Sequence, residues 1–424
     1  MNRVDDIVPH WAQRTPDAIA LKEPGRVWTY AELDALIRKT AMLLAERGVR
    51  GGDRVMILCE NCCGAVALYF ACTRLDAWPI VVNNKLSERE IEDIRAHSGA
   101  RLVLRVNGKS DLAACIASAE PNARCAPEPP EDVAENDVAA LVYTSGSTGK
   151  PKGVMLSHAS LMFVAAATAK ARALVPEDHV QAVLPVSHIL GLTGVLLGSF
   201  YAGACVHLVP RFDPAASLKA LKDDGLSVII GTPSMYAMLA EYAARKGATP
   251  IPAPRLRLIS SAGAPLDMPT KAAAEAAFAM PLHNGYGMTE CGPTLTLTPL
   301  DAPRADCGIG RLLPGIEARI AGDGVGELFV RTPGMMTGYY KAPEETVAVL
   351  DAEGWLRTGD LARFDGESWF IEGRAKEMII RFGFNVYPAE IEGVLNAHPT
   401  VARAAVIGRM KDGNEDILAF VHAA

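Results

Sequence analysis

Eleven consecutive residues, Tyr143-Thr-Ser-Gly-Ser-Thr-Gly-Lys-Pro-Lys-Gly153, constrain the fold more than any other stretch of this sequence. They hold three glycines, four hydroxyl side chains besides Tyr143, and two lysines. The apolar run 139–143 before them predicts a buried strand, and Ser157 after them can cap a helix that opens at His158. Glycine lets backbone N–H groups approach a ligand closely, and lysine adds charge without demanding fixed geometry. The stretch is therefore predicted to be a loop that binds a polyanion.

This loop matches neither of the two common nucleotide-binding loops. A Walker A loop needs four residues between its first glycine and its Gly-Lys pair, whereas two residues separate Gly146 from Gly149, and Pro151 follows Lys150. The Gly-Lys-Ser at 108–110 has Val103 where the first glycine should stand, and the sequence has no Gly-x-Gly-x-x-Gly fingerprint. The alternative interpretation is a Gly/Ser surface linker, but linkers are seldom placed between a buried strand and a capped helix.

Composition limits the partners that the protein can have. A net charge of −7 over 424 residues gives no general attraction to nucleic acid or to anionic membranes, so we expect neither as a partner. The longest apolar run, 189–204, is short and interrupted by glycine, so we expect a buried helix and no membrane span. The nine cysteines are scattered, and Cys59, Cys62 and Cys63 are expected to be reduced core thiols. An odd cysteine count without a signal peptide favours the cytoplasm.

Strand and helix patterns alternate through the first 290 residues. Helix starts are indicated by capping boxes at 29–32 and 87–90 and by Asp213 before Pro214. Strands are predicted at 53–59, 101–106 and 227–231, and a Pro- and Glu-rich connector at 121–137. From Gly308 the pattern changes to short strands between turns, such as 326–331 and 368–372. A β-α-β pattern follows at 377–380, 388–396 and 401–408, with one more strand at 416–421.

These patterns predict an α/β protein with a large N-terminal region of wound α/β layers plus a β-rich subdomain, followed by an incomplete small α+β C-terminal domain. About fifty residues after Lys376 form only a marginal core by themselves. We place the boundary between the two domains at 1–375 and 376–424.

Five sequence motifs occur in a fixed order along the chain. The loop 143–153 is followed by Leu184-Pro-Val-Ser-His188, Asn284-Gly-Tyr-Gly-Met-Thr-Glu290, Trp355-Leu-Arg-Thr-Gly-Asp360 and Gly373-Arg-Ala-Lys-Glu-Met-Ile-Ile380. In this order they resemble the adenylate-forming superfamily, which includes acyl- and aryl-CoA synthetases, the adenylation domains of peptide synthetases, and beetle luciferase. The resemblance runs from about residue 7 to the last residue, and the first and third motifs are its most specific parts.

The resemblance implies an ATP-dependent acid–CoA ligase that uses ATP, Mg²⁺ and CoA. An acid carboxylate attacks the α-phosphorus of ATP, pyrophosphate leaves, and a thiol then attacks the acyl-AMP. Such chemistry depends on positioning and charge neutralisation. The implied ATP and AMP contacts are Thr144, Ser145, Gly146, Ser147, Thr148, Gly149, Lys150, Gly263, Ala264, Asn284, Gly285, Tyr286, Gly287, Thr289, Asp360 and Arg374. The implied catalytic residues are Thr144, Lys150, His188, Thr289 and Glu290, with Glu290 as the magnesium ligand.

The resemblance also places the acid substrate. It implies a pocket formed by His188, Ile189, Leu192, Ala262, Gly285 and Met288. A purely structural role for His188 stays open, since a lone histidine at an apolar helix start is often structural. The implied segments, 188–193, 231–236, 260–265 and 284–293, contain no arginine or lysine. We therefore expect an apolar aliphatic or aromatic monocarboxylate, and a preference for a dicarboxylate would contradict this expectation.

The C-terminal part of the resemblance leaves alternatives open. Lys376 falls at the position of the hinge about which the small domain rotates in this superfamily. The family's Pro-Lys-Thr-x-x-Gly-Lys segment is not found before Ala424, and Lys411, which we expect in a turn after a strand, does not match its context. Either the chain is truncated or it is a short member with a slow first half-reaction. Two further alternatives are transfer of the acyl group to a carrier-protein pantetheine arm and a non-catalytic adenylate-binding remnant. A homo-oligomer also stays open.

Overall fold

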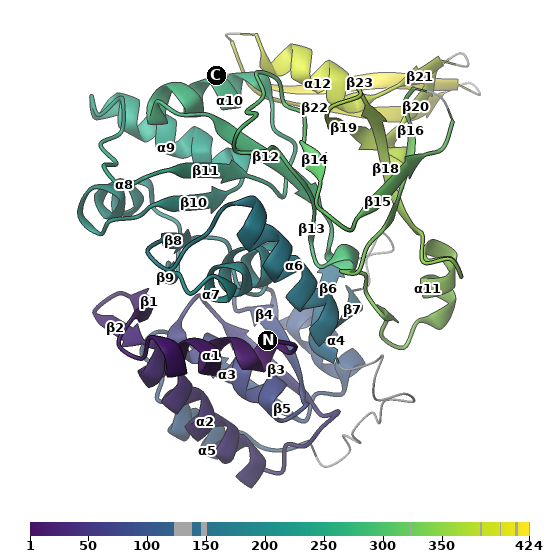
Figure 1. The fold of residues 1–424 in the computed structure, drawn as a ribbon. Helices are drawn as coiled ribbons and strands as arrows, with labels where there is room; N and C mark the ends of the chain where they lie inside the picture. Colours follow the sequence, from purple (N-terminus) through teal and green to yellow (C-terminus); the bar gives the residue numbers. More distant parts are fainter. Residues whose placement is uncertain are drawn as a thin grey trace.

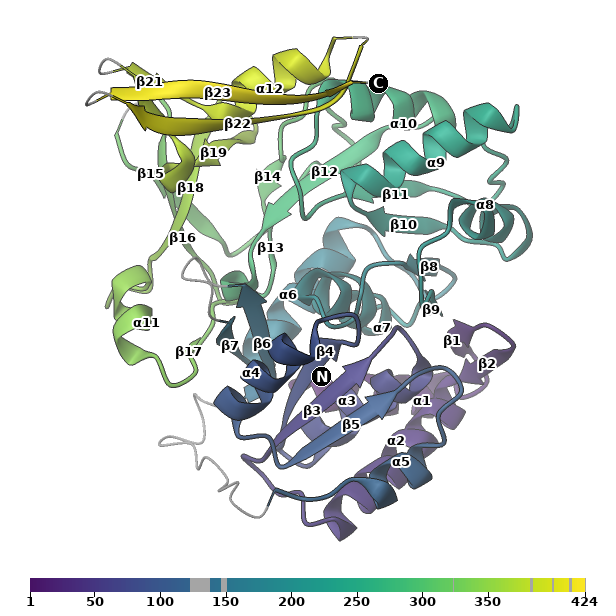
Figure 2. The same cartoon turned by 180° about the vertical axis from the view of Figure 1, so that it is seen from behind.

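The computed structural model shows how the alternating pattern folds into layers (Figure 1). It describes residues 1–122, 138–145, 151–322, 324–381, 384–398, 400–411 and 414–423. Most of the connector predicted at 121–137 lies outside these residues. Figure 2, the view from behind, shows the N-terminal part at one end of the molecule and the C-terminal hairpin at the other.

The N-terminal end is a small parallel sheet covered by helices. Its strands, in the order β4-β3-β5, are Trp78–Asn83, Arg54–Cys59 and Leu102–Val106. The accompanying helices are α1 (Ile7–Arg14), α2 (Tyr30–Glu46), α3 (Cys63–Arg74), α4 (Glu88–Ser98) and α5 (Leu112–Ser118). Both predicted capping boxes are present: Thr29 accepts from the Glu32 N–H at 3.2 Å, and Ser87 accepts from the Glu90 N–H at 3.3 Å. These local signals set the helix starts as predicted.

A nine-stranded sheet forms the middle layer, in the order β14-β13-β12-β11-β10-β8-β9-β1-β2. Its strands from β12 to β1 run parallel, as expected for wound α/β layers. In sheet order they are Arg311–Leu312, Thr294–Leu297, Leu282–Gly287, Leu258–Ser261, Val228–Gly231, His179–Ala182, Cys205–Leu208, Ile19–Glu23 and Arg26–Thr29. Helices α8 (Pro214–Asp223), α9 (Pro233–Arg245) and α10 (Met268–Phe278) follow β9, β10 and β11 along the chain and connect the strands of this sheet.

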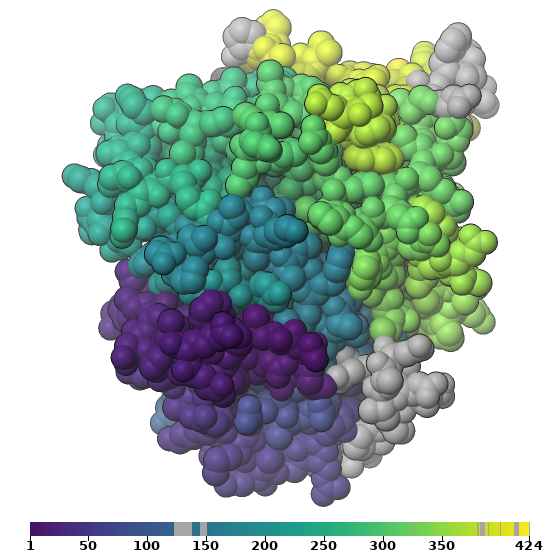
Figure 3. Space-filling model, in the orientation of Figure 1, coloured from purple at the N-terminus to yellow at the C-terminus, as the bar shows by residue number. Residues whose placement is uncertain are grey.

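Helix α6 (His158–Ala171) lies at the centre of the molecule (Figure 1). It follows a hairpin of β6 (Val138–Ser145) and β7 (Pro151–Ser157), which β17 (Gly338–Tyr339) extends. Beside it, the predicted buried helix at 189–204 is present as a π-helical segment, Leu190–Leu197, that continues into α7 (Gly198–Tyr201). In the space-filling view, the purple N-terminal part and the green β-rich part border α6 on the face shown (Figure 3).

The β-rich part and the C-terminal elements follow the prediction with small shifts. The antiparallel sheet β15-β16-β18-β19 consists of Glu317–Ile320, Gly326–Arg331, Leu356–Phe364 and Trp369–Arg374, and α11 spans Pro343–Val349. The remaining elements are β20 (Ile379–Arg381), β21 (Phe384–Val386), α12 (Pro388–Asn396), β22 (Val401–Lys411) and β23 (Asn414–Ala423). The α/β fold class with its β-rich and small α+β parts is thus confirmed.

Two predicted boundaries were wrong. Glu377, expected to begin a strand, belongs to a short 3₁₀ helix, Ala375–Glu377, and β20 starts two residues later. Lys411, expected in a turn, is the last residue of β22 and is opposite Asn414 of β23. The two strands form a long antiparallel ladder, which extends each of them beyond its apolar pattern.

Candidate active site

The phosphate-loop motif spans the change from β6 to β7: its residues 143–145 end β6 and its residues 151–153 begin β7. Thr144 is opposite Lys152 and Ser145 is opposite Pro151 in the ladder. The predicted phosphate contacts at 146–150 lie outside the described residues, as does the side chain of Ser145. The buried strand predicted before the loop is confirmed. The residues 151–153, expected to belong to the loop, instead begin β7, because they pair with residues 143–145 of β6.

Helix α6 starts directly after this hairpin. Ser157 caps it by accepting from the Ser160 N–H at 3.1 Å, which confirms the predicted start. The other end of the helix is capped by Arg172, whose side chain is only 2 % exposed. One helix therefore connects the hairpin that carries the loop with a buried guanidinium.

The third motif, 284–290, needs glycine for reasons visible in the backbone. A Cβ on Gly287 would lie 1.7 Å from the Pro293 carbonyl oxygen, and one on Gly285 would lie 2.8 Å from the Thr296 oxygen. Both glycines let β12 pass close to β13, which follows it in the sheet. The amide Nδ2 of Asn284 donates to the Cys307 carbonyl at 3.0 Å, which fixes the start of the motif.

Glu290 lies on a 3₁₀ turn, Thr289–Cys291, at the end of this motif. Its carboxylate is half-buried and accepts from the Tyr339 hydroxyl at 2.8 Å. The Met336 N–H also donates to its backbone oxygen at 2.8 Å, so the turn is held in place. A carboxylate with free acceptor capacity is a hard oxygen ligand of the kind that magnesium prefers, and the residue present therefore fits the predicted metal.

Asp360 on β18 connects the third, fourth and fifth motifs. It is 4 % exposed, accepts from the Tyr286 hydroxyl, and lies 3.0 Å from Arg374 Nε. Burial raises the pKa of Asp360, although the Tyr286 hydrogen bond and the Arg374 charge oppose this effect. The structure therefore brings three predicted nucleotide-binding residues into contact, from positions 74 residues apart in the case of Tyr286 and Asp360.

His188 lies at the start of the π-helical segment, with its side chain exposed. Its Nδ1 accepts from the Leu190 N–H at 3.2 Å, which leaves the proton of a neutral ring on Nε2. Desolvation lowers the pKa of His188, so the ring is neutral at pH 7. The imidazole can therefore present an N–H donor to a ligand while its other nitrogen stays engaged with the helix start.

A cavity of about 110 Å³ opens beside His188 and the third motif. Five of the six predicted acid-pocket residues line it, together with further residues that we predicted for the nucleotide. Leu192 is not among the lining residues, although it is buried at 2 % exposure. The complete lining is Arg172, His188, Ile189, Leu190, Ala262, Gly263, Gly285, Tyr286, Gly287, Met288, Thr289, Pro293, Thr294 and Leu297.

The four implied segments hold no arginine or lysine, but Arg172, which lies outside them, also lines this cavity. Arg172 lies at the end of α6, outside the four segments on which the expectation depended. No local pattern in the sequence marks this arginine as part of the pocket. Only the packing of α6 against the π-helical segment brings it there.

The remaining predicted residues lie at the edges of the site. Gly263 follows β11 with a φ of +84°, a conformation that favours glycine, and lines the cavity. Ala264 is exposed beside it. Lys376 is also exposed, on the 3₁₀ helix directly after β19. Its role as a hinge stays a prediction.

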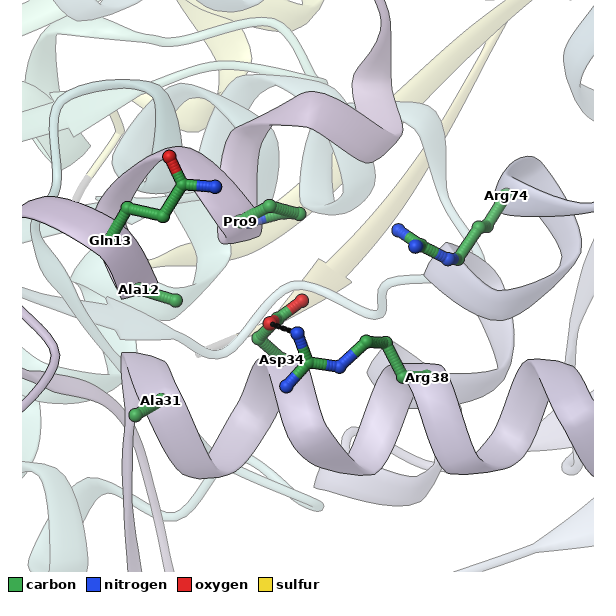
Figure 4. Close-up of a pocket in the computed structure, with 7 residues that line it drawn as sticks. All are labelled: Pro9, Ala12, Gln13, Ala31, Asp34, Arg38 and Arg74. Atoms are coloured by element: carbon green, nitrogen blue, oxygen red, sulfur yellow. Dashed lines mark ion pairs between the residues drawn. The ribbon is translucent and has the colours of Figure 1, made fainter.

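A second hollow, of about 300 Å³, contains none of the predicted site residues (Figure 4). Residues of α1, α2 and α3 line it, and Asp34 and Arg38 form an ion pair of 2.7 Å across one turn of α2. Figure 4 shows Arg74 pointing into the same space from α3. The larger hollow is therefore a polar surface groove remote from the five motifs.

One group of metal-binding side chains also lies outside the site. Ligand atoms of His179, Cys205 and His207 are all within 4.8 Å of one another. The two imidazoles are already joined, with His179 Nδ1 2.8 Å from His207 Nε2. Burial and the nearby Lys22 ammonium lower the pKa of both rings, and the same ammonium opposes a further cation. We therefore describe this group as a hydrogen-bonded pair in the core.

Among the described residues, the cysteines are free thiols. Burial raises the pKa of Cys62 to about 11 and raises those of Cys59 and Cys63 further, so these thiols stay protonated, as predicted for core residues. Of the helices that the structure describes, none combines the length and apolar character needed to cross a membrane.

The chain belongs to the AMP-binding enzyme family, whose family model matches residues 8–340. It is 33 % identical over 417 residues to a feruloyl-CoA synthase of an Amycolatopsis species, covering 94 % of this chain and 84 % of that one. It is 32 % identical over 422 residues to 2-succinylbenzoate–CoA ligase of Bacillus licheniformis, covering 94 % and 86 %. The family predicted from the five motifs is confirmed, and these relatives are acid–CoA ligases by name.

Solved structures agree with this assignment. ATP-bound MatB from Rhodopseudomonas palustris superposes with a TM-score of 0.88 at 28 % identity, covering 99 % of this chain and 88 % of that one. The o-succinylbenzoate-CoA synthetase of Bacillus subtilis, in complex with its acyl-adenylate intermediate, superposes with a TM-score of 0.86 at 29 % identity, covering 99 % and 88 %. The whole described fold, including its C-terminal elements, is thus that of this enzyme class.

Proposed function

We propose that this protein is an ATP-dependent carboxylic acid–CoA ligase. The acid carboxylate attacks the α-phosphorus of ATP and displaces pyrophosphate, which gives the acyl-AMP. The thiol sulfur of CoA then attacks the acyl carbon, AMP leaves, and the thiol proton is released. The observation that carries this proposal is the cluster of Asp360, Tyr286 and Arg374 next to a cavity, in a chain of the AMP-binding enzyme family.

Each residue has a distinct task in this scheme. Asp360 accepts the ribose hydroxyls, for which its two oxygens are suited, and Arg374 keeps its charge balanced. His188 donates from Nε2 to the acid carboxylate at the cavity mouth and orients it. Thr289 and the loop 144–150 bind the phosphates through hydroxyl, backbone N–H and Lys150 donors. These positioning and charge effects are the main requirement of phosphoryl transfer.

Glu290 would hold Mg²⁺, which neutralises phosphate charge when bound. Tyr339 keeps the Glu290 carboxylate oriented toward the site. We also propose that residues 376–424 form a small domain that rotates about Lys376 between the two half-reactions, and that the protein works in the cytoplasm.

Pyrophosphate release with a panel of carboxylic acids tests the proposal directly. We expect release that depends on both ATP and acid, followed by thioester formation when CoA is added. Release without a thioester to CoA, but with transfer to a carrier protein's pantetheine arm, would assign the acceptor differently. Tight ATP binding with no release for any acid would contradict the proposed activity and favour a nucleotide-binding protein.

The loop supplies a matched pair of variants. We expect Lys150→Ala to lower kcat/KM for ATP about 10- to 100-fold, because it removes a charge-assisted phosphate contact. The control is Lys170→Ala, which removes an exposed lysine from α6. Equal effects of the two variants would exclude a specific role for Lys150.

A further inference from the structure

Arg172 is a buried cation whose donors are mostly unused. Its side chain is among the largest that are fully enclosed, at 2 % exposure. Nη1 donates to the Gly194 carbonyl at 2.6 Å, but Nε and Nη2 are buried without a hydrogen-bond partner. Buried polar groups normally find partners, and an unpaired donor on a charged group is costly to bury. The partner expected for these two nitrogens therefore comes from a ligand.

The described residues supply no counter-charge for Arg172. Tyr236 is the described residue that interacts electrostatically with it, but burial raises the pKa of this hydroxyl, so it stays neutral. Asp178 is already held by Arg257 and by the Ser227 hydroxyl, at 2.7 Å for the latter. Burial lowers the pKa of Arg172 to about 10, which still leaves the guanidinium charged at neutral pH. The cavity wall thus contains one uncompensated positive charge.

A second unused donor lies close to this guanidinium. Thr294 also lines the cavity, and its Oγ1 is buried without a partner. Gly194 separates the two groups: a Cβ placed on it would lie 3.9 Å from Arg172 Nη1 and 3.7 Å from Thr294 Oγ1. The nearest neighbour of that Cβ would be Leu190 Cδ1 at 2.8 Å, so the apolar Leu190 side chain packs beside the guanidinium and the hydroxyl. Together the guanidinium and the hydroxyl form a small donor site with no acceptor in it.

Exposure orders the cavity from mouth to floor. His188 is exposed, whereas Arg172 and Thr294 are 2 % and 5 % exposed, so the donor site is at the deep end. The intervening wall is apolar, with Ile189, Leu190 and Leu297. The volume of about 110 Å³ is smaller than an engineered cavity of about 150 Å³ that accepts benzene. The cavity thus has His188 at its mouth, an apolar wall in the middle, and Arg172 with Thr294 at its deep end. A ligand that contacts all three parts has a polar group at each end and a short hydrocarbon middle.

From this arrangement we infer that the acid substrate is a short dicarboxylic acid. Its first carboxylate meets His188 and the nucleotide, and its second accepts from Nε and Nη2 of Arg172 and from the Thr294 hydroxyl. A carboxylate matches two parallel guanidinium donors better than any neutral group does. This inference depends on the proposed ligase activity, and it differs from the apolar monocarboxylate expected from the sequence.

The test compares matched acids that differ in one carboxylate, namely butanoate with butanedioate and pentanoate with pentanedioate, by pyrophosphate release. We expect the wild type to prefer the dicarboxylate of each pair. Arg172→Met, which keeps the side-chain volume, should lower the dicarboxylate-to-monocarboxylate ratio of kcat/KM about 10- to 100-fold. Arg172→Lys should restore part of this ratio because it returns the charge, and Thr294→Val should lower it several-fold.

Thermal unfolding gives a second readout that does not need turnover. Without acid, Arg172→Met should have a Tm at or above that of the wild type, because it removes an unpaired buried charge. In the presence of ATP, butanedioate should raise the Tm of the wild type and leave that of Arg172→Met unchanged. A large drop in Tm for both Arg172→Met and Arg172→Lys would overturn the inference, since Arg172 would then be structural.

The outcomes separate this inference from the proposed function. Pyrophosphate release with monocarboxylates or hydroxy acids, and an unchanged ratio in Arg172→Met, would overturn the dicarboxylate while leaving the ligase activity intact. No release with any acid, together with a Tm that ATP does not raise, would contradict the ligase itself. Preference for the dicarboxylate that disappears only in the Arg172 and Thr294 variants supports both.

Discussion

Two arginines meet at the C-terminal end of α6, and they are stabilised in opposite ways. Arg257 donates from Nε to Asp178 at 2.9 Å, from Nη1 to the Arg172 carbonyl at 3.2 Å and from Nη2 to the Ala173 carbonyl at 2.8 Å. Arg172 has one hydrogen bond to a carbonyl and two nitrogens without partners. Protein groups accept from all three donor nitrogens of Arg257, whereas two nitrogens of Arg172 are available to a ligand. Residue type and burial alone therefore do not distinguish a structural cation from a binding one; the partner list does.

The largest expected effect on stability comes from breaking the Asp178–Arg257 ion pair. Asp178→Asn should lower the free energy of unfolding by about 1–3 kcal/mol, because it removes the charge of a buried carboxylate from Arg257, which solvent partly screens. Urea unfolding measures this change. If the loss is below about 1 kcal/mol, the pair does not stabilise the end of α6 as the geometry indicates.

The same pair predicts a pH dependence of stability. Burial acts to raise the pKa of Asp178, but the Arg257 and Ser227 hydrogen bonds outweigh it and hold this pKa below the usual value. The ionised pair therefore stabilises the protein above pH about 4, and this contribution is lost as the pH falls through the lowered pKa. Urea midpoints measured from pH 7 to pH 3 should show a steeper fall for the wild type than for Asp178→Asn.

Asp360 belongs to both classes, since it has protein partners and is also proposed to bind nucleotide. Asp360→Asn should weaken ATP binding about 10- to 100-fold, with a small change in stability. Because the pKa of Asp360 is raised, wild-type affinity should fall at a higher pH than for an ordinary carboxylate, and the variant should lack this fall. Calorimetric titration with ATP between pH 7.5 and pH 5 checks both points, and parallel curves would contradict them.

His188 should show a smaller effect, confined to the acid. His188→Ala removes a neutral hydrogen bond of about 0.5–1.5 kcal/mol, so the KM for the acid should rise about 2- to 10-fold while that for ATP stays constant. His398→Ala, which removes an exposed histidine in the C-terminal elements, is the matched control. A change in Tm without a change in KM would show that His188 only caps the π-helical segment.

The smallest effect is expected at an exposed pair. Lys219 and Asp223 form an ion pair of 2.7 Å on the surface of α8, at one helical turn. Such pairs rarely contribute measurably, because solvent screens them. Lys219→Ala should therefore unfold at the wild-type Tm, and a clear loss would blur the contrast between surface pairs and the Asp178–Arg257 pair.

Local signals in the sequence were enough for much of the fold. Ser157, Thr29 and Ser87 cap helices as predicted, because a cap depends on residues three positions apart. The order of strands in the nine-stranded sheet could not be predicted in this way. It depends on which apolar faces pack together over the whole chain, and not on any short pattern.

The residues of the candidate site also fall into two groups: those within contiguous motifs and those that only tertiary contacts bring to the site. The predicted site residues come from five contiguous motifs, and the structure brings two of them, Asp360 and Tyr286, together. Tyr339, which donates to the Glu290 carboxylate, and Arg172, which lines the cavity beside His188, lie outside those motifs. Both reach the site only through tertiary contacts, and an unpartnered guanidinium becomes visible only when its surroundings are known.

The length of helix α6 sets a distance between two parts of the candidate site. Its 14 residues, at about 1.5 Å each, set a rigid length of about 21 Å between the hairpin of the phosphate loop and Arg172. Inserting one residue into the helix would turn everything beyond it by about 100° and carry the guanidinium out of the cavity wall. If both proposals hold, the span between the two substrates is set by a helix length, and substitutions at the C-cap of α6 should change acid selectivity without changing the proposed phosphate loop.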